Sequence, residues 1–148
     1  MTKQPSLRSR AIAYLARREH SRAELARRLA PHAADPDEIP ALLDELARRK
    51  LLSDDRYAEA RAHTLARKVG VARIEHELRA QGLDAGTIAR ATREVRATEL
   101  DRAREAWRKR FRTPAANALE KAKQMRFLQG RGFSFEVIRR VVQGAEED

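Results

Sequence analysis

One apolar spacing recurs three times along the chain, and it constrains the fold more than any other feature of the sequence. Each time a Leu is followed ten residues later by an Ile, at Leu29 and Ile39, Leu78 and Ile88, and Leu128 and Ile138. The second pair lies 49 residues after the first, and the third lies 50 residues after the second. Self-similarity at periods of about 20 to 50 residues is typical of small units that stack in a row. The sequence therefore predicts three similar units.

The residues between each Leu and Ile indicate how one helix ends and the next begins. Gly82 and Gly132 each stand four residues after the repeated Leu, and an apolar residue follows each of them. A left-handed Gly followed by an apolar side chain that packs back on the helix is a common helix ending. The polar residues that precede each Ile are good N-caps, at Asp35, Asp84 and Ser134. In the first unit, Pro36 is predicted to be the first helical residue, after a loop at 31–34 that replaces the Gly.

Each unit is predicted to contain a further helix before these two. Apolar residues at helical spacing predict it at 7–18, 53–68 and 100–111. Ser21 and Glu24 form a capping pattern that opens the middle helix of the first unit, and Gly70 stands 49 residues after Ser21 at the matching place. The fold class is therefore all-α, with three tandem three-helix repeats at 1–52, 53–98 and 99–145. An acidic tail at 146–148 follows.

The segment RGFSFEVI, residues 131–138, offers a different interpretation, because it nearly matches the base-stacking strand of an RRM domain. An RRM would also need alternating strand patterns elsewhere, and the sequence has none. In the helical interpretation Gly132 ends one helix and Ser134 caps the next. Phe135, Ile138 and Val142 are then expected to form the buried stripe of that last helix.

The composition agrees with a helical protein of the cell interior. Only 5% of the residues are aromatic and 36% are charged, so the core must consist mainly of Ala, Leu, Ile and Val. The absence of Cys excludes disulfides, thiol catalysis and thiolate metal sites, and it fits a reducing cytoplasm. No apolar stretch approaches the ~20 residues that span a bilayer, and the N-terminus lacks the apolar run of a signal peptide. We expect a soluble, cytoplasmic chain without membrane contact.

Catalytic motifs are missing from the sequence. The four His residues, His20, His32, His63 and His76, have no metal-ligand spacing, and we expect each at the surface or at a helix boundary. No P-loop, dinucleotide-binding glycine pattern or nucleophile elbow is present. Most carboxylates lie three or four residues from an Arg, which is ordinary pairing on a helix surface. The sequence predicts a protein that is not an enzyme and needs no cofactor.

The positive charge is the strongest functional indication. The net charge is +10, from 32 basic and 22 acidic residues, and 26 of the basic residues are Arg. Residues 100–148 carry 12 basic and 7 acidic residues, whereas 51–99 carry 9 and 8. A solvated helical surface in a GC-rich genome would explain part of this bias. Its concentration in the third repeat favours a surface for phosphates or for an acidic protein groove.

The candidate contact residues are the third-repeat cations predicted to lie opposite the apolar stripes. With Trp107 pointing inward, the cations of its helix fall on the other side, and the same holds for the two helices that follow. The candidates are Arg102, Lys109, Arg112, Lys123, Arg126, Arg131, Arg139 and Arg140. Whether these faces join depends on how the helices pack.

A second function remains open for the first repeat. The segments around 21–29 and 37–49 resemble a helix-turn-helix, with a recognition helix at Ile39 to Arg49. That helix carries Asp37, Glu38, Asp44 and Glu45, which would repel the DNA backbone. A DNA-binding transcription regulator is therefore the alternative.

Four motifs in order resemble a known family, the RecX proteins that regulate the RecA recombinase. The resemblance covers residues 7–142, and each motif is modest alone but specific in this order and spacing. Val71-Ala72 stands where the family often has Gly-Pro, and Tyr57 stands where it commonly has Phe. The motifs are Arg18-Glu19-His20-Ser21 with Glu24-Leu25, Leu52 to Ala58, Arg73-Ile74 with Glu77-Leu78, and Arg126 to Ile138.

This resemblance implies an elongated, curved array of three-helix repeats. It also implies binding in the groove of RecA–DNA filaments and inhibition of three RecA activities, namely its ATPase, strand exchange and co-protease activities. The implied partners are the RecA filament and single-stranded DNA, contacted directly or through the filament, with the protein acting as a monomer. No cofactor, metal or catalytic residue is implied.

Overall fold

The structure is a computed structural model that describes residues 4–147, with side chains described for 4–145. Over these residues the chain forms nine α-helices and one short 3-10 turn, and no strand. The first three helices are α1 (Leu7–Arg17), α2 (Arg22–Leu29) and α3 (Glu38–Arg48), with the turn η1 (Ala30–His32) between the last two. The next are α4 (Asp54–Leu65), α5 (Val71–Ala80) and α6 (Ala85–Ala97). The last are α7 (Glu99–Arg110), α8 (Ala118–Gly130) and α9 (Phe135–Glu147).

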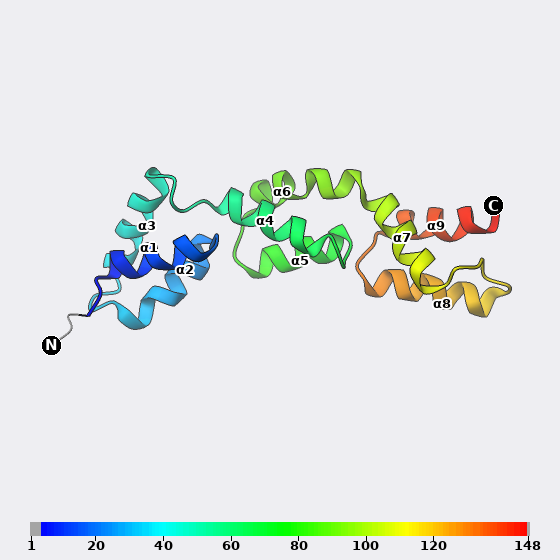
Figure 1. Ribbon diagram of the computed structural model, residues 1–148, viewed down its shortest axis with the longest axis horizontal. Helices are drawn as coiled ribbons and strands as arrows, with labels where there is room; N and C mark the ends of the chain where they lie inside the picture. The colour runs from blue at the N-terminus through cyan, green and yellow to red at the C-terminus, as the bar shows by residue number, and fades with distance from the viewer. Residues whose placement is uncertain (1–3, 148) are drawn as a thin grey trace.

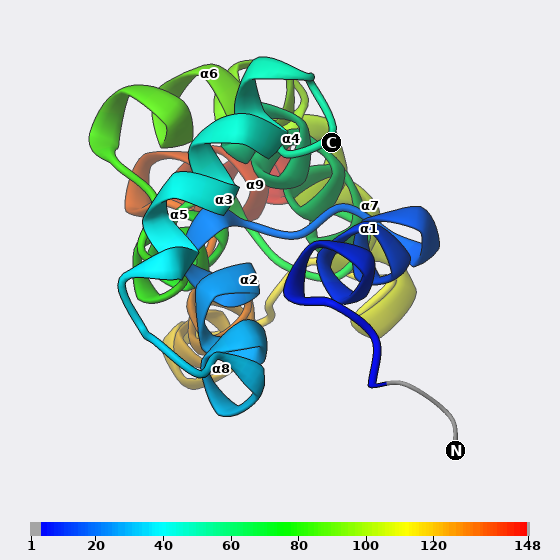
Figure 2. The same cartoon turned by 90° about the vertical axis from the view of Figure 1, so that its left-hand side faces the viewer.

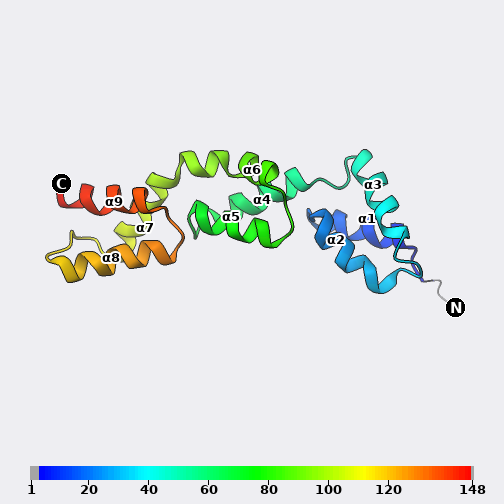
Figure 3. The same ribbon diagram turned by 180° about the vertical axis from the view of Figure 1, so that it is seen from behind.

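The nine helices form an elongated row of three units, with the two ends of the chain at opposite ends of the row (Figure 1). The view from behind shows the same order, with α6 and α9 along one edge of the row and α5 and α8 along the other (Figure 3). Viewed along the row from its N-terminal end, the first unit lies in front and its helices partly cover those of the units behind it (Figure 2). The all-α fold of three three-helix repeats is therefore confirmed. None of the described helices is long and apolar enough to cross a membrane.

Each unit has its own apolar core. The buried cluster of the first unit draws its residues from 11–52, that of the second from 57–95 and that of the third from 103–142. The repeated Leu residues, Leu29, Leu78 and Leu128, are each 0% exposed, and the repeated Ile residues are buried beside them. The period of the sequence thus marks the equivalent core positions of three separate cores.

The predicted glycine helix ends are confirmed. Gly82 and Gly132 have φ values of 82° and 87°, the left-handed region that side chains disfavour. The amide of Leu83 donates to the carbonyl of Leu78 at 3.3 Å, and the residues after Gly132 repeat this arrangement. The first unit closes α3 in the same way, but with Lys50 at φ 62° in place of Gly.

The N-caps are confirmed in part. The carboxylate of Asp84 accepts from the amide of Thr87 at 2.8 Å, and Ser134 accepts from Val137 at 3.2 Å. The prediction for Asp35 is wrong, because α3 begins at Glu38 and no side chain caps it. The Asp35 carboxylate instead accepts from the Asp37 amide at 2.9 Å, which closes a turn ahead of the helix.

One further prediction about burial is wrong. Phe135 is 69% exposed, because it lies in the first turn of α9 and Phe133, two residues earlier, fills that end of the core. The buried face of α9 consists of Ile138, Val141 and Val142. His20 lies at the boundary between α1 and α2, as expected, but it is 1% exposed, and its Nδ1 lies 3.0 Å from the carbonyl oxygen of Arg18. The predicted acidic tail covers residues 146–148. The backbone of α9 runs through Glu147, whereas the side chains of 146 and 147 and all of Asp148 lie outside the described residues.

Candidate interaction surfaces

Six of the eight candidate cations lie exposed on the third repeat. Lys109 is on α7, Arg112 follows that helix, and α8 and α9 carry the remaining four, Lys123, Arg126, Arg139 and Arg140. Lys109 has a distant pair with Glu105 at 3.9 Å, and the side chains of the other five make no ion pair or hydrogen bond with described residues. Each points away from the shared core of its unit. The unpaired charge is therefore distributed around the outer sides of the repeat.

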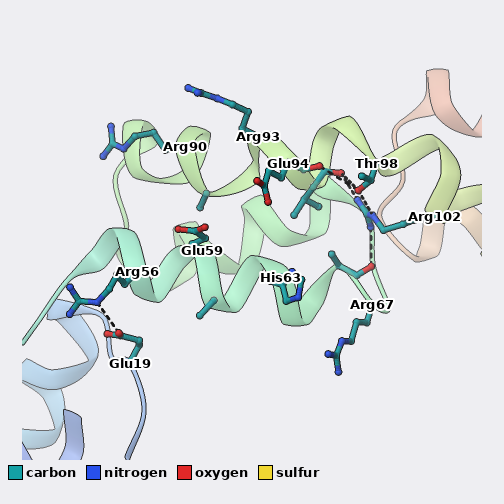
Figure 4. A pocket seen from close by; sticks show the side chains of 14 residues that line it. Glu19, Arg56, Glu59, His63, Arg67, Arg90, Arg93, Glu94, Thr98 and Arg102 are labelled. Atoms are coloured by element: carbon teal, nitrogen blue, oxygen red, sulfur yellow. Dashed lines mark hydrogen bonds and ion pairs between the residues drawn. The ribbon is translucent and has the colours of Figure 1, made fainter. Parts of the chain in front are cut away.

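Arg102 does not lie on a solvent face, and that expectation is wrong. Its guanidinium is half-buried and donates to the carbonyl oxygens of Ala66 and Val69, each at 3.0 Å, and of Val95 at 2.7 Å (Figure 4). Burial lowers the pKa of Arg102, and the nearby carboxylate of Glu99 opposes this effect. Arg102 satisfies carbonyls at the ends of α4 and α6, so it fastens the third repeat to the second.

Arg131 is also part of the contact between the second and third repeats. Its guanidinium lies 5.0 Å from the centre of the Phe127 ring and donates to the carbonyl oxygen of Lys68 at 3.2 Å. Its own carbonyl oxygen accepts from the amide of Gly70 at 2.7 Å. Sequence reasoning placed Arg131 among the candidate contact residues. The structure shows that its guanidinium also has a structural role in this contact.

Two glycines allow this contact to form between backbones. A Cβ at Gly70 would lie 2.5 Å from the carbonyl oxygen of Gly132, and a Cβ at Gly132 would lie 2.4 Å from the Cβ of Arg73. Arg73 adds a hydrogen bond to the carbonyl oxygen of Gly130. We call this contact the second joint. It brings main-chain atoms of the two repeats together, which only residues without side chains permit.

The first joint, between the first and second repeats, is made mainly by side chains. Arg56 pairs with Glu19 at 2.8 Å, and the carboxylate of Asp54 accepts from the amide of Arg22 at 2.7 Å. Neither apolar core extends across this joint. The two joints of the row therefore differ in kind. The first relies on carboxylates, whereas in the second Arg side chains donate to carbonyl oxygens and two backbones meet closely.

The middle helix of the first repeat begins at a charged contact close to this joint. Ser21 accepts from the amide of Glu24 at 3.0 Å, as predicted, but the Glu24 carboxylate binds Arg18 at 2.6 Å. The hydrogen bonds from Arg18 are the main reason that the pKa of Glu24 lies below its ordinary value. The capping pattern is thus only half formed, because the Glu24 carboxylate binds Arg18 and not the backbone amide of Ser21.

A groove of about 880 Å³ runs between α4 and α6 on the second repeat. Figure 4 shows Glu59 and Glu94 between the two helices, whereas Arg67 and Arg93 extend away on opposite sides. None of these four side chains is paired with a described residue. The described residues contain no cluster of three or more potential metal ligands. With both signs of charge present, the groove has neither a metal centre nor the single sign that would attract phosphates.

Aromatic side chains add a feature that sequence reasoning missed. The rings of Phe111 and Phe127 meet edge to face with their centres 5.4 Å apart, and Arg110 lies 5.5 Å from the first ring. Phe135 is exposed on the same repeat. The signal was present in the sequence, because all four Phe residues lie in the most basic third of the chain. Which of them reach the surface depends on packing.

Comparisons with known proteins agree on one family along the chain. The three domains described as the first, second and third three-helix domains of RecX match residues 8–46, 53–91 and 97–142. The regulatory protein RecX of Leptothrix cholodnii is 53% identical over 145 residues, which cover 98% of this chain and 92% of that protein. That of Ralstonia nicotianae is 46% identical, with 99% and 92% covered.

Solved structures agree with the fold. The crystal structure of RecX from Lactobacillus salivarius superposes with a TM-score of 0.80 over 96% of both chains, at 20% identity. A further crystal structure of a regulatory protein RecX gives a TM-score of 0.75 at 21% identity, over 93% of this chain and 70% of that one. Three domain matches in order, together with close similarity over nearly the full length, show that this chain belongs to the RecX family.

Proposed function

We propose that this protein binds RecA–DNA filaments and inhibits the recombinase, acting on its ATPase, strand exchange and co-protease activities. Membership of a family of regulatory proteins carries the proposal. The shape is suitable, because three units in a row present a long surface with several contact points to an extended partner. We further propose that the protein acts as a monomer in the cytoplasm, where the filament forms.

The unpaired cations of the third repeat are the proposed contact to DNA. Lys123, Arg126, Arg139 and Arg140 are exposed and make no ion pair with described residues, so neutralising phosphates would not break existing pairs. Arg102 is excluded from this surface because its guanidinium is already bound to three carbonyl oxygens. Contacts of this kind position a protein on a nucleic acid without reading its sequence.

The alternative, a helix-turn-helix regulator that reads duplex DNA, has less support. The proposed recognition helix α3 uses its carboxylates within its own repeat, where Glu45 pairs with Arg8 at 3.1 Å and Asp44 pairs with Arg22 at 2.6 Å. A helix with acidic residues along its exposed side would be repelled by the phosphates that flank a major groove. Sequence-specific binding to duplex DNA in the absence of RecA would favour this alternative.

The test is the ATPase activity of RecA on single-stranded DNA, measured with the wild-type protein and with three double variants. K123E/R126E and R139E/R140E reverse cations of the third repeat, and R17E/R48E makes the same charge change on the first. We expect the third-repeat variants to lose inhibition and R17E/R48E to keep it. The outcome that contradicts the proposed surface is loss of inhibition in R17E/R48E with both other variants unaffected.

Salt dependence separates contacts to DNA from contacts to the recombinase. Each phosphate contact that is removed should lower the slope of log affinity against log salt by ~0.7 on a single strand. A contact to acidic protein side chains should show a shallower dependence, because only ordinary screening acts on it. Titrations at several salt concentrations, with and without RecA, therefore assign each pair of cations to one partner.

A further inference from the structure

Phe135 is unusual among the aromatic residues of this protein. Four large apolar side chains are exposed in the part of the chain that the structure describes, Ile12, Leu51, Leu119 and Phe135, and only the last is aromatic. Trp107, Tyr57 and Phe133 are buried in the cores of their units. Apolar residues that are exposed singly are ordinary on protein surfaces, so a role for Phe135 has to be argued from its ring and its neighbours.

The exposure of Phe135 is not required by the packing of α9. The core at this end of the helix is filled by Phe133 from the preceding loop, and α9 contributes Ile138 and Val142 further along. Residue 135 stands in the first turn of the helix, beyond the Ser134 cap, where a polar helix former would serve equally well. The fold therefore leaves the ring without a structural task.

Phe135 shares its side of α9 with an exposed cation. Arg139 follows one turn later on the same side of α9 and is exposed and unpaired among the described residues. Arg131 lies in the turn before the helix, but its guanidinium and that of Arg73 donate to carbonyl oxygens at the second joint. Glu136 is the exposed acid in this turn, whereas Glu99 is buried and accepts from the amide of Ser134 at 3.1 Å. Arg139 is therefore the cation of this turn that can act together with the ring.

The apolar surface around the ring is too small for a protein partner of the usual kind. Leu119, the other exposed apolar residue of this repeat, lies near the start of α8, and that helix ends at Gly130 before the turn to α9. At 1.5 Å per residue the two ends of α8 are roughly 18 Å apart. Protein hot spots cluster in desolvated apolar patches, whereas single rings among cations suit the bases and phosphates of a single strand.

We propose that Phe135 is a stacking platform for an unpaired base of single-stranded DNA, with Arg139 contacting a neighbouring phosphate. The inference rests on the proposed function in one respect, since it takes the single strand of that function as the ligand. A duplex would not serve, because its bases are stacked on each other and present only their edges. Stacking on a phenyl ring tolerates any base, so no sequence preference is expected.

The test compares two single strands that carry the same phosphates. Anisotropy of a labelled 20-residue oligothymidine is measured against that of an abasic deoxyribose-phosphate 20-mer, for the wild type and for F135A, F135L and F135W. We expect the wild type to bind oligothymidine more tightly, and F135A to weaken that binding roughly tenfold while leaving the abasic strand unchanged. F135L should behave like F135A, and F135W should keep the base-dependent part.

Two control variants accompany these measurements. L119A removes the other exposed apolar side chain of the repeat and should bind both strands like the wild type. R139Q should weaken binding to both strands equally, because a phosphate contact does not distinguish them. Since Phe135 is largely exposed, F135A should melt at the wild-type temperature, so a loss of binding is not a loss of fold.

Equal binding of the two strands by the wild type would overturn the stacking proposal, and so would full binding by F135L, which keeps an apolar side chain without a ring. Inhibition of RecA by a wild type that shows no base dependence would reject stacking and leave the proposed function intact. Base-dependent binding by a protein that does not inhibit RecA would support stacking and reject the proposed function.

Discussion

At the scale of single residues, Gly82 and Gly132 have the same backbone conformation but different surroundings. At Gly82 an added Cβ would lie 3.2 Å from the Cβ of Ala23, whereas at Gly132 it would lie 2.4 Å from that of Arg73. The left-handed strain is common to both sites, at roughly 1 to 2 kcal/mol for a side chain. At both sites the neighbouring repeat must give way, but Ala23 must move only slightly, whereas Arg73 must move much further.

We therefore expect G132A to lower the free energy of unfolding by more than G82A, and G82A to lower it by about 1 kcal/mol. Gly86 is the matched control, because it lies in the first turn of α6 with open contacts of 3.4 Å and beyond. G86A should be neutral or stabilising by up to ~1 kcal/mol. Urea denaturation of the three variants measures this order, and equal effects at all three sites would contradict it.

Glu24 gives a prediction about acid stability. Because Arg18 holds the pKa of Glu24 in the folded chain below its ordinary value of 4.5, the ionised carboxylate stabilises the fold above that pH. This contribution is lost as the pH falls through the lowered pKa. We expect E24Q to unfold more easily than the wild type at pH 7, and the difference to shrink towards pH 3.

Thermal melts across that pH range, with E59Q as the control at an unpaired carboxylate, measure the effect. If the difference in melting temperature between the wild type and E24Q stayed constant down to pH 3, the Arg18 contact would not act through the charge of Glu24.

At the scale of helices, the ends of α4 and α6 depend on a residue from the next repeat. Arg102 of α7 satisfies the carbonyl oxygens of Ala66, Val69 and Val95. We expect R102A to lower the free energy of unfolding by about 1 to 3 kcal/mol, because buried carbonyls lose their partner. R104A is the control on the same helix, where the side chain is exposed and its pair with Asp101 is distant at 3.9 Å. Chemical denaturation distinguishes them, and equal stability of the two variants would refute the role of Arg102.

The helices were predictable from sequence where local chemistry decides them. The repeated Leu and Ile positions, the two left-handed glycines and the cap at Asp84 follow from spacing and residue type alone. The start of α3 was not predictable, because two turns between 30 and 37 delay the helix. Neither the burial of Arg102 nor the exposure of Phe135 could be predicted, because each depends on a neighbouring unit or loop that the local pattern does not show. The sequence therefore predicted that the third repeat is basic, but it did not predict which of its residues are exposed.

At the scale of the whole molecule, three separate cores predict that the repeats can be removed from one end. Each unit buries its own apolar residues, so a chain of residues 1–98 should keep most of its helical signal per residue. It should unfold more easily than the full chain, because the second repeat loses the contacts of Arg102 and Arg131. Circular dichroism measures both properties. Complete loss of helix in this fragment would indicate one indivisible core.

The difference between the two joints has a mechanical consequence. Charged contacts such as that of Arg56 with Glu19 weaken as ions screen them, whereas the hydrogen bond from Gly70 to Arg131 between closely packed backbones is far less sensitive. The two joints of the molecule should therefore differ in bending stiffness. We expect the second and third units to keep a fixed arrangement, and the first unit to bend more easily as the ionic strength rises. Bound along a partner whose helical pitch varies, the protein would keep its second and third units in place. It would adapt to the change in pitch by bending at the first joint.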